Sequence, residues 1–220
     1  MTRAVVIGGC GYVGRHVCMA LSRLGFQVLQ LDLIAPSLTF LNKVAELTVP
    51  ILYQRIDIAK EEGRLIEVFS TFQPEIVISV AGWGMSGADM LSPLCYTINV
   101  QGTENILTAC KVAGVQFFIY TSTYNVIFGG EEILGSNEDT PYFPLDQHTD
   151  EYSKSKALAE QMVLQANGQT VCDGRTLCTS VLRPAAIYGE TEQRHLPRIV
   201  KHIDQVRETY TFLHEYYVYT

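Results

Sequence analysis

The glycines near the amino terminus constrain the fold more than any other feature of this sequence. A run of small and β-branched apolar residues at 4–7 ends at Gly8, and Gly11 and Gly14 follow at intervals of three. Residues 15–24 then place apolar side chains at helical spacing. Strand, glycine turn and helix in this order form the phosphate-binding start of a dinucleotide-binding fold.

Each of these glycines has its own physical reason. Gly8 lets the chain turn tightly off the strand, where a Cβ would clash. Gly11 lets the backbone approach a pyrophosphate, and Gly14 lets the helix pack close to the strand. The free N–H groups and the positive dipole end of that helix would then face the phosphates. Because three glycines at this spacing also arise by chance, their position after a buried strand carries the prediction.

Asp32 extends the dinucleotide pattern. It ends a second apolar run at 27–31, about twenty residues beyond the glycines, where an acid meets the ribose hydroxyls. A carboxylate accepts hydrogen bonds from both hydroxyls and repels a 2′-phosphate, and residues 33–42 contain no Lys or Arg. The pattern therefore favours NAD over NADP. The alternative is that Asp32 caps a loop.

Strand and helix patterns alternate along the chain, which predicts an α/β fold: a Rossmann-type, doubly wound parallel sheet covered on both faces. The expected strands are 4–7, 27–31, 51–56, 76–80, 116–120 and 180–182, and the expected helices are 12–24, 62–72, 93–113 and 151–167. Loops near 82–89 and 129–148 would leave the carboxyl ends of strands, where ligands bind. We expect an NAD(P)-binding domain over 1–203 and a divergent, disordered tail over 204–220.

Composition excludes several classes of protein. The net charge of −7 argues against nucleic acid as the main partner. We recognise no signal peptide and no apolar stretch of about eighteen residues, so we expect a cytoplasmic chain without a membrane span. The six cysteines show no CxxC pair and no metal-like spacing, so no metal site is expected. Four of them lie in apolar patterns, which is typical of core thiols in a reducing compartment.

Tyr152 and Lys156 form a candidate catalytic pair. They stand four residues apart at the start of a predicted helix, so both side chains project from one face. A tyrosine pKa of about 10 makes a poor base, and lowering it to about 7 takes roughly 4 kcal/mol. One cation at ~4 Å in an effective dielectric of ~20 supplies about that much. The pair could take a proton from an alcohol while hydride leaves for a nicotinamide. The alternative is a solvated helix start.

Polar residues near this pair are further candidates. Ser122 and Thr123 follow the fifth expected strand, where a hydroxyl can bridge a substrate oxygen and Tyr152. Asn99 lies in an expected helix and could anchor a water next to Lys156. The alternative for Asn99 is a capping or packing amide.

The residues after the third and fourth expected strands suggest cofactor contacts. Asp57 follows the third strand, where an acid can hold an adenine amino group or cap the strand end. Ala81 and Gly82 follow the fourth strand, and their small size would let a flat ring lie against the backbone.

The order of these motifs resembles that of extended short-chain dehydrogenases/reductases. GGxGxxG, Asp32, NVxGTxN, YTST, YxxxK and LRPAAIYG occur in that family's order and rough spacing. The segments YTSTYNVIFGG, RPAAIYG and EQRHLPRIV are similar to the 3β-hydroxysteroid dehydrogenase-type group, and within it to the 42E branch. The resemblance covers about residues 3–203.

This resemblance implies a Rossmann fold, a bound nicotinamide cofactor, and Tyr152 as catalytic acid/base with Lys156 as its partner. It places the catalytic hydroxyl at Thr123 rather than Ser122, and Pro184 beside the nicotinamide. The alternative for Pro184 is a strand terminator. Family members often form homodimers through helices such as 93–113 and 151–167. The cofactor contacts expected from the motifs and the resemblance are Gly8, Gly11, Tyr12, Val13, Gly14, Asp32, Asp57, Ile58, Ala81, Gly82, Tyr152, Lys156 and Pro184.

The sequence departs from the family pattern in two places. Ala59 and Lys60 follow Asp57, where the family usually has another acid or Thr. The similarity stops after 194–203, whereas family members continue well beyond it. That further part supplies most of the substrate lid and, in the 42E branch, segments that associate with membranes at the cytosolic face of the endoplasmic reticulum. We therefore expect a truncated chain with only a remnant of the C-terminal substrate domain.

Three functions remain open at this point. The first is an NAD-dependent oxidoreductase acting on a secondary alcohol or ketone, with a sterol-like ring as one candidate substrate. The second is a truncated cofactor-binding module with weak catalysis, or a dimer partner. The third is a nucleotide-sugar epimerase or dehydratase, which uses the same catalytic residue types.

Overall fold

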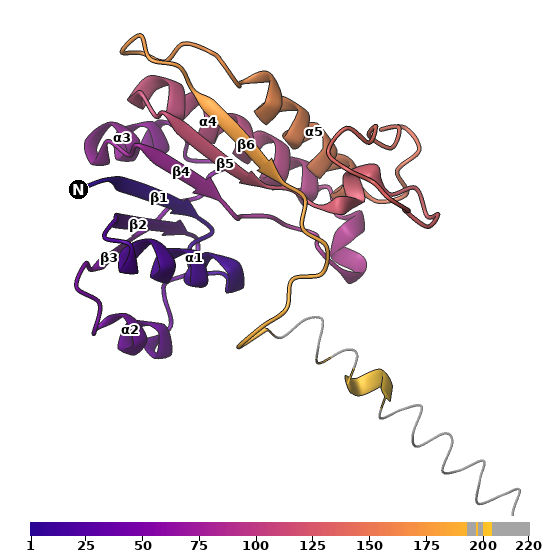
Figure 1. The fold of residues 1–220 in the computed structure, drawn as a ribbon, viewed down its shortest axis with the longest axis horizontal. Helices are drawn as coiled ribbons and strands as arrows, with labels where there is room; N and C mark the ends of the chain where they lie inside the picture. Colours follow the sequence, from indigo (N-terminus) through magenta and orange to yellow (C-terminus); the bar gives the residue numbers. More distant parts are fainter. Residues whose placement is uncertain (193–196, 198–199, 204–220) are drawn as a thin grey trace, which may run out of the picture. The chain divides into compact units, whose positions relative to one another are not determined.

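In the computed structural model, which describes residues 1–192, 197 and 200–203, six parallel strands form a single sheet (Figure 1). The strands are β1 (Arg3–Ile7), β2 (Gln27–Asp32), β3 (Ile51–Arg55), β4 (Ile76–Ser79), β5 (Phe117–Thr121) and β6 (Cys178–Leu182). Their order in the sheet is β3-β2-β1-β4-β5-β6. The chain builds outward from β1 in one direction and from β4 in the other. This confirms the doubly wound, Rossmann-type parallel sheet.

The helices connect successive strands. They are α1 (Tyr12–Arg23), α2 (Leu38–Val44), α3 (Glu62–Phe72), α4 (Gly102–Ala113) and α5 (Glu151–Gln165), with 3₁₀ turns η1 (Gly87–Leu91) and η3 (Tyr124–Ile127) and the π-helical segment η2 (Tyr96–Gln101). The helix expected over 93–113 is thus divided into η2 and α4. The sequence analysis did not predict α2, which Ser37 caps by accepting a hydrogen bond of 3.2 Å from the N–H of Phe40.

Apolar side chains bury both faces of the sheet because neighbouring strand residues point in opposite directions. Val5 and Ile7 of β1 belong to a large cluster with side chains of α3, α4 and α5. Val6, between them, belongs to a smaller cluster with Cys18 of α1 and Phe40 of α2. Figure 1 shows α3, α4 and α5 on one side of the sheet and α1 and α2 on the other. This two-sided burial explains the continuous apolar run at 4–7.

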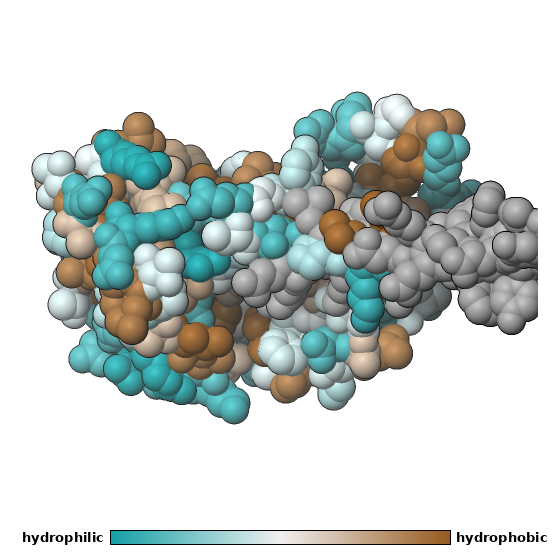
Figure 2. Space-filling model, turned by 90° about the horizontal axis from the view of Figure 1, so that it is seen from below, coloured by the Kyte–Doolittle hydropathy of each residue, from teal (hydrophilic) through white to brown (hydrophobic). Residues whose placement is uncertain are grey.

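Contacts divide the chain into two compact units, Met1–Pro184 and Ala185–Thr220. All strands and helices named above lie in the first unit. The domain boundary expected at residue 203 stays a prediction, and the tail expected over 204–220 lies outside the described residues. None of the helices in the described part of the chain has the length and apolar character of a membrane span. On the face drawn in Figure 2, hydrophobic side chains form separate patches among hydrophilic ones.

Candidate functional site

The end of β1 meets the end of β4 at the point where the strand order reverses, which is where open α/β sheets bind ligands. Gly8 follows β1 with a φ of +77°, and its N–H donates to the carbonyl of Leu31 at 2.8 Å. A Cβ on Gly8 would lie 2.8 Å from the backbone nitrogen of Ala81. A side chain there would force the two strand ends apart. Two features of the structure therefore require glycine at position 8: the positive φ and the proximity of Ala81.

The first turn of α1 contains no acidic side chain and lies against the glycine turn. Gly11 is its N-cap, with no side-chain cap and no acidic residue in the first turn. A Cβ on Gly14 would collide with the carbonyl of Gly8, so the helix lies directly against the glycine turn. The N–H groups of Tyr12 and Val13 fall in the first turn, where a helix provides no carbonyl partner. A small-residue turn with unsatisfied N–H groups fits the diphosphate of a dinucleotide.

Asp32 is tied to the same turn. Its carboxylate accepts a hydrogen bond of 3.0 Å from the N–H of Cys10 and one of 3.2 Å from the N–H of Ile34. The carboxylate therefore does cap the loop, as the alternative stated, and it also contacts the glycine turn through the Cys10 N–H. Burial, assisted by the negative charge of Asp32, raises the pKa of the Cys10 thiol to about 12. Carboxylate oxygens accept several hydrogen bonds, so Asp32 keeps capacity for ribose hydroxyls.

Asp57 forms local hydrogen bonds at the end of β3. Its carboxylate accepts a hydrogen bond of 3.0 Å from the N–H two residues on, and its own N–H donates to Glu61 at 2.7 Å. These contacts are those of a strand-end cap, and contact of Asp57 with adenine stays a prediction. Ile58 lies over Gly102 of α4, where a Cβ would come within 2.8 Å of the Ile58 Cδ1.

The cap of α5 fixes the position of Tyr152. Asp150 accepts a hydrogen bond of 2.7 Å from the Ser153 N–H and one of 2.9 Å from the Ser153 hydroxyl. The helix begins at Glu151, which places Tyr152 in its first turn. Tyr152 is only 8% exposed and Lys156 only 3%. Both side chains are buried, so the alternative of a solvated helix start is wrong.

Lys156 binds to β5. Its Nζ donates to the Tyr120 hydroxyl at 2.7 Å and to the Thr121 carbonyl at 2.6 Å, and it lies 4.1 Å from the centre of the Tyr120 ring. Burial lowers the pKa of Lys156 to about 7, against the opposing effect of the nearby carboxylate of Glu160. Sequence analysis missed Tyr120, because its place in a buried strand pattern gives no sign of a polar role.

Asn99 of η2 uses its whole amide group. Its Oδ1 accepts from the Trp83 N–H at 2.9 Å, and its Nδ2 donates to the Trp83 carbonyl and to the Ser155 hydroxyl, both at 2.9 Å. The Ser155 hydroxyl in turn donates to the Tyr152 carbonyl at 2.8 Å. These are the contacts of a packing amide, the alternative role. They tie the loop after Gly82 to the first turn of α5.

The two hydroxyls after β5 have different surroundings. The Thr123 Oγ1 accepts a hydrogen bond of 3.3 Å from the Asn125 N–H and so caps η3. The Ser122 Oγ is buried and has no hydrogen-bond partner among the described residues. Pro184 follows β6, and its carbonyl accepts from the Tyr124 N–H at 3.2 Å. Both candidate hydroxyls and Pro184 therefore lie at the carboxyl ends of adjacent strands.

A buried ion pair between Glu160 and Arg183 joins three segments of the chain. Glu160 of α5 is 1% exposed, and its Oε1 accepts from the Tyr142 hydroxyl at 2.9 Å and from two nitrogens of Arg183 at 2.8 and 2.7 Å. It thereby links the 129–148 loop, α5 and the end of β6. Sequence analysis missed this cluster, although a Glu four residues after Lys156 on a buried helix face was an available signal.

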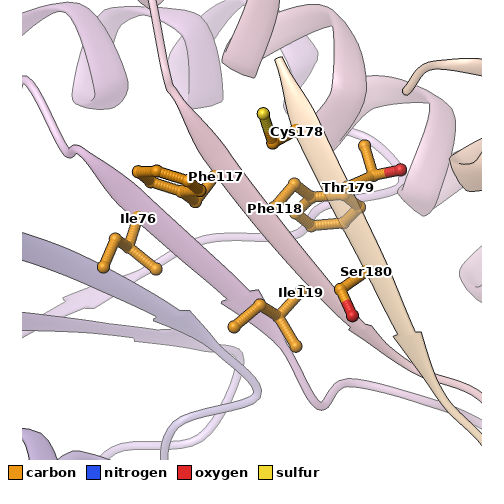
Figure 3. A pocket seen from close by; sticks show the side chains of 7 residues that line it. All are labelled: Ile76, Phe117, Phe118, Ile119, Cys178, Thr179 and Ser180. Carbon is orange, nitrogen blue, oxygen red and sulfur yellow. The ribbon is translucent and has the colours of Figure 1, made fainter. Parts of the chain in front are cut away.

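An apolar cavity of about 350 Å³ lies on the strands themselves. Its lining comes from β4, β5 and β6 (Figure 3) and consists of Ile76, Phe117, Phe118, Ile119, Cys178, Thr179 and Ser180. None of the predicted site residues lines it. Within the described ranges, no group of three His, Cys, Asp or Glu side chains is arranged to hold a metal ion.

Comparison with sequence families gives a consistent match. A family model described as the 3-beta hydroxysteroid dehydrogenase/isomerase family matches residues 5–217. Short-chain dehydrogenase/reductase family 42E member 1 of Bos taurus is 40% identical over 211 residues, covering 91% of this chain and 50% of the relative. The 3 beta-hydroxysteroid dehydrogenase type 7 of Homo sapiens is 35% identical over 196 residues, covering 86% and 51%. The chain spans about half the length of the curated relatives it matches.

Solved structures share the fold. UDP-glucose 4-epimerase of Thermus thermophilus, solved in complex with NAD, has a TM-score of 0.69 at 27% identity and covers 88% of this chain and 58% of its own. The Bordetella bronchiseptica enzyme WbmH, solved with NAD+, has a TM-score of 0.74 at 21% identity and covers 93% and 63%.

Proposed function

The chain belongs to the 3-beta hydroxysteroid dehydrogenase/isomerase family, and on this premise we propose that it is an NAD-dependent oxidoreductase of secondary alcohols and ketones. A sterol-like ring is the substrate class that the family relationship favours. The observation that carries the proposal is the burial of Tyr152 and Lys156 on successive turns of one helix. Lys156 also contacts the strand that leads into Ser122 and Thr123.

The residues that would hold the dinucleotide come from the ends of several strands. The turn containing Gly8, Gly11 and Gly14 would hold the diphosphate through the N–H groups that open α1. Asp32 would accept from the adenosine ribose hydroxyls, and its charge supports NAD over NADP. The rest of the site would be lined by Ala81, Gly82, Asp57, Ile58 and Pro184. When bound, the nicotinamide supplies the acceptor or donor of hydride.

The chain's own residues would handle the proton. Tyr152 would take the hydroxyl proton of an alcohol at its phenolic oxygen, or return it to a ketone. A protonated Lys156 would favour the phenolate form of Tyr152 through its charge. Thr123, with Ser122 beside it, would hydrogen-bond the substrate oxygen. The Ser122 oxygen is buried and has no hydrogen-bond partner in the part of the chain that the structure describes. This supports the placement, because buried hydroxyls generally have a partner.

Two other functions retain specific support. A cofactor-binding module with weak catalysis is supported by the six-stranded parallel sheet, a fold that solved structures in complex with NAD share. An epimerase is supported by the 27% identity to a UDP-glucose 4-epimerase. The homodimer expected through α4 and α5 stays a prediction.

The decisive experiment combines Tyr152→Phe with a panel of hydroxysteroids, NAD and NADH. We expect turnover to fall about a hundredfold or more while NADH affinity, measured by fluorescence titration, stays nearly intact. Tyr96→Phe is the matched control, because Tyr96 is 55% exposed. Unchanged turnover in Tyr152→Phe would remove Tyr152 from the mechanism.

The same assay separates the three functions. NADH binding by the unmodified chain without turnover of any panel member would support the cofactor-binding module. Conversion of a UDP-hexose would support the epimerase. NADP bound more tightly than NAD would contradict the role proposed for Asp32.

A further inference from the structure

The side-chain partner of Lys156 on β5 is the hydroxyl of Tyr120, and Tyr120 is itself fully enclosed. Tyr120 is 1% exposed, and its oxygen lies 2.7 Å from the Lys156 Nζ. A buried tyrosine hydroxyl that contacts only apolar atoms would be costly, and one that faces a buried ammonium is a specific arrangement. The contact joins α5 to β5 across 36 residues of sequence.

The direction of the hydrogen bond between Tyr120 and Lys156 follows from the chemistry of the ammonium group. A lysine ammonium has donors only, so the Tyr120 oxygen accepts from Lys156. The Nζ also lies 4.1 Å from the centre of the Tyr120 ring, which adds a cation–π contact. The same Nζ donates to the Thr121 carbonyl at 2.6 Å. Two consecutive residues of β5 therefore hold the Lys156 ammonium.

We propose that Tyr120 is a positioning residue for Lys156 and stabilises the ammonium form of Lys156 by accepting a hydrogen bond from it. With the Thr121 carbonyl as second acceptor, two of the three ammonium hydrogens are bound within the described part of the chain, and the third would serve a cofactor ribose. The importance of the Lys156–Tyr120 hydrogen bond for turnover rests on the proposed function, whereas its effect on the charge of Lys156 is independent of that function.

Among the described residues, the other titratable neighbours of Lys156 do not replace Tyr120 as an acceptor of its ammonium hydrogen. Tyr152 and Glu160 lie on the same helix as Lys156, and the charge of Glu160 raises the Lys156 pKa. Both Arg183 and Tyr142 donate to that carboxylate, which disperses its charge. Burial raises the pKa of Tyr120, so its hydroxyl stays protonated at neutral pH and acts as a neutral acceptor.

The test measures the pKa of Lys156 directly in the full chain by NMR of ¹³Cε-labelled lysine. Lys156→Arg identifies the resonance among the six lysines. In Tyr120→Phe, we expect the Lys156 pKa to fall by about 1 or more, because a hydrogen bond to a charged group is lost. Tyr96→Phe should leave it unchanged. An unaltered Lys156 pKa in folded Tyr120→Phe, or an equal fall in Tyr96→Phe, would overturn the proposal.

A second measurement keeps the proposal testable if Tyr120→Phe does not fold. In the unaltered chain labelled with ¹³Cζ-tyrosine, we expect the Tyr120 resonance to shift as Lys156 titrates, because the Tyr120 oxygen accepts from the Lys156 ammonium. The shift should be absent in Lys156→Met. If no tyrosine resonance titrates with the midpoint of Lys156, or if the shift persists in Lys156→Met, the proposal is overturned. This titration needs no substrate, so its outcome is independent of the Tyr152→Phe assay.

Discussion

At the scale of single residues, the fold buries the ammonium group of Lys156 almost completely. Lys156 is 3% exposed, and burial lowers its pKa from 10.5 to about 7. An unfolded chain restores the ordinary pKa, so between pH 7 and 10.5 the unfolded state binds more protons than the folded one. The free energy of unfolding must therefore rise with pH across this window through Lys156 alone. Below about pH 7 Lys156 is charged in both states, so burial of its charge lowers the free energy of unfolding by the full amount.

Lys156→Met should therefore stabilise the protein while abolishing turnover. We expect a gain of about 1–4 kcal/mol at about pH 6, since an apolar side chain replaces a buried ion. The gain should shrink as the pH rises toward about 8.5, because the folded lysine is then largely neutral. Urea unfolding of both proteins at several pH values measures it, and Lys60→Met, at an exposed position, corrects for the loss of one positive charge. A gain that grows with pH would show that the sign of this argument is wrong.

At the scale of elements, glycines in two helices have opposite roles. Gly14 in α1 faces the backbone of the preceding turn, whereas Gly63 in α3 has open space where a Cβ would stand. The first glycine is required by the packing of the helix on the turn, and the second only adds conformational freedom to the unfolded chain.

Gly14→Ala and Gly63→Ala form a matched pair at this scale. The added methyl at position 14 meets a carbonyl oxygen, so we expect a loss of about 1–3 kcal/mol and weakened NADH binding. The same change at position 63 should stabilise the fold by about 0.5–1 kcal/mol and leave NADH binding intact. Thermal unfolding and NADH titration measure both effects. Equal stability of the two variants would contradict the packing described for α1.

Most elements followed from local patterns, and the differences have physical causes. The helix predicted over 62–72 is α3 itself, because its apolar spacing and flanks are clear. The 93–113 prediction missed the π-helical start at 96–101, where the Asn99 contacts with Trp83 and Ser155 hold the chain. The helix at 38–44 went unpredicted because it is short, and Phe40 is its one buried residue.

At the scale of the whole molecule, the fold determines which of the six cysteine side chains are exposed and which are buried. Cys18, Cys95 and Cys110 are buried and Cys10 is partly so, whereas Cys172 and Cys178 are exposed. The sequence analysis expected four core cysteines without naming them, and three of the six are buried. Desolvation raises the pKa of Cys10 and Cys18 to about 12, and the thiolate is the form that reacts.

Titration with a disulfide reagent should reveal this division. We expect two thiols to react rapidly in the folded protein, those of Cys172 and Cys178, and all six in denaturant. Replacing both exposed cysteines by serine should remove the rapid phase. Rapid reaction of the Cys110 thiol in the folded state would contradict this division and would mean that the large apolar cluster opens readily in solution.

The sequence by itself determined the glycine turn after β1, the parallel sheet and the placement of Tyr152 and Lys156 on successive turns of one helix, because each depends on residues close together or on a period that repeats along the chain. Only the tertiary structure decided the partners of Lys156 and Glu160. Tyr120 and Arg183 lie 36 and 23 residues away from them. Contacts at such separations depend on how α5 packs against β5 and β6, and no local pattern encodes that packing.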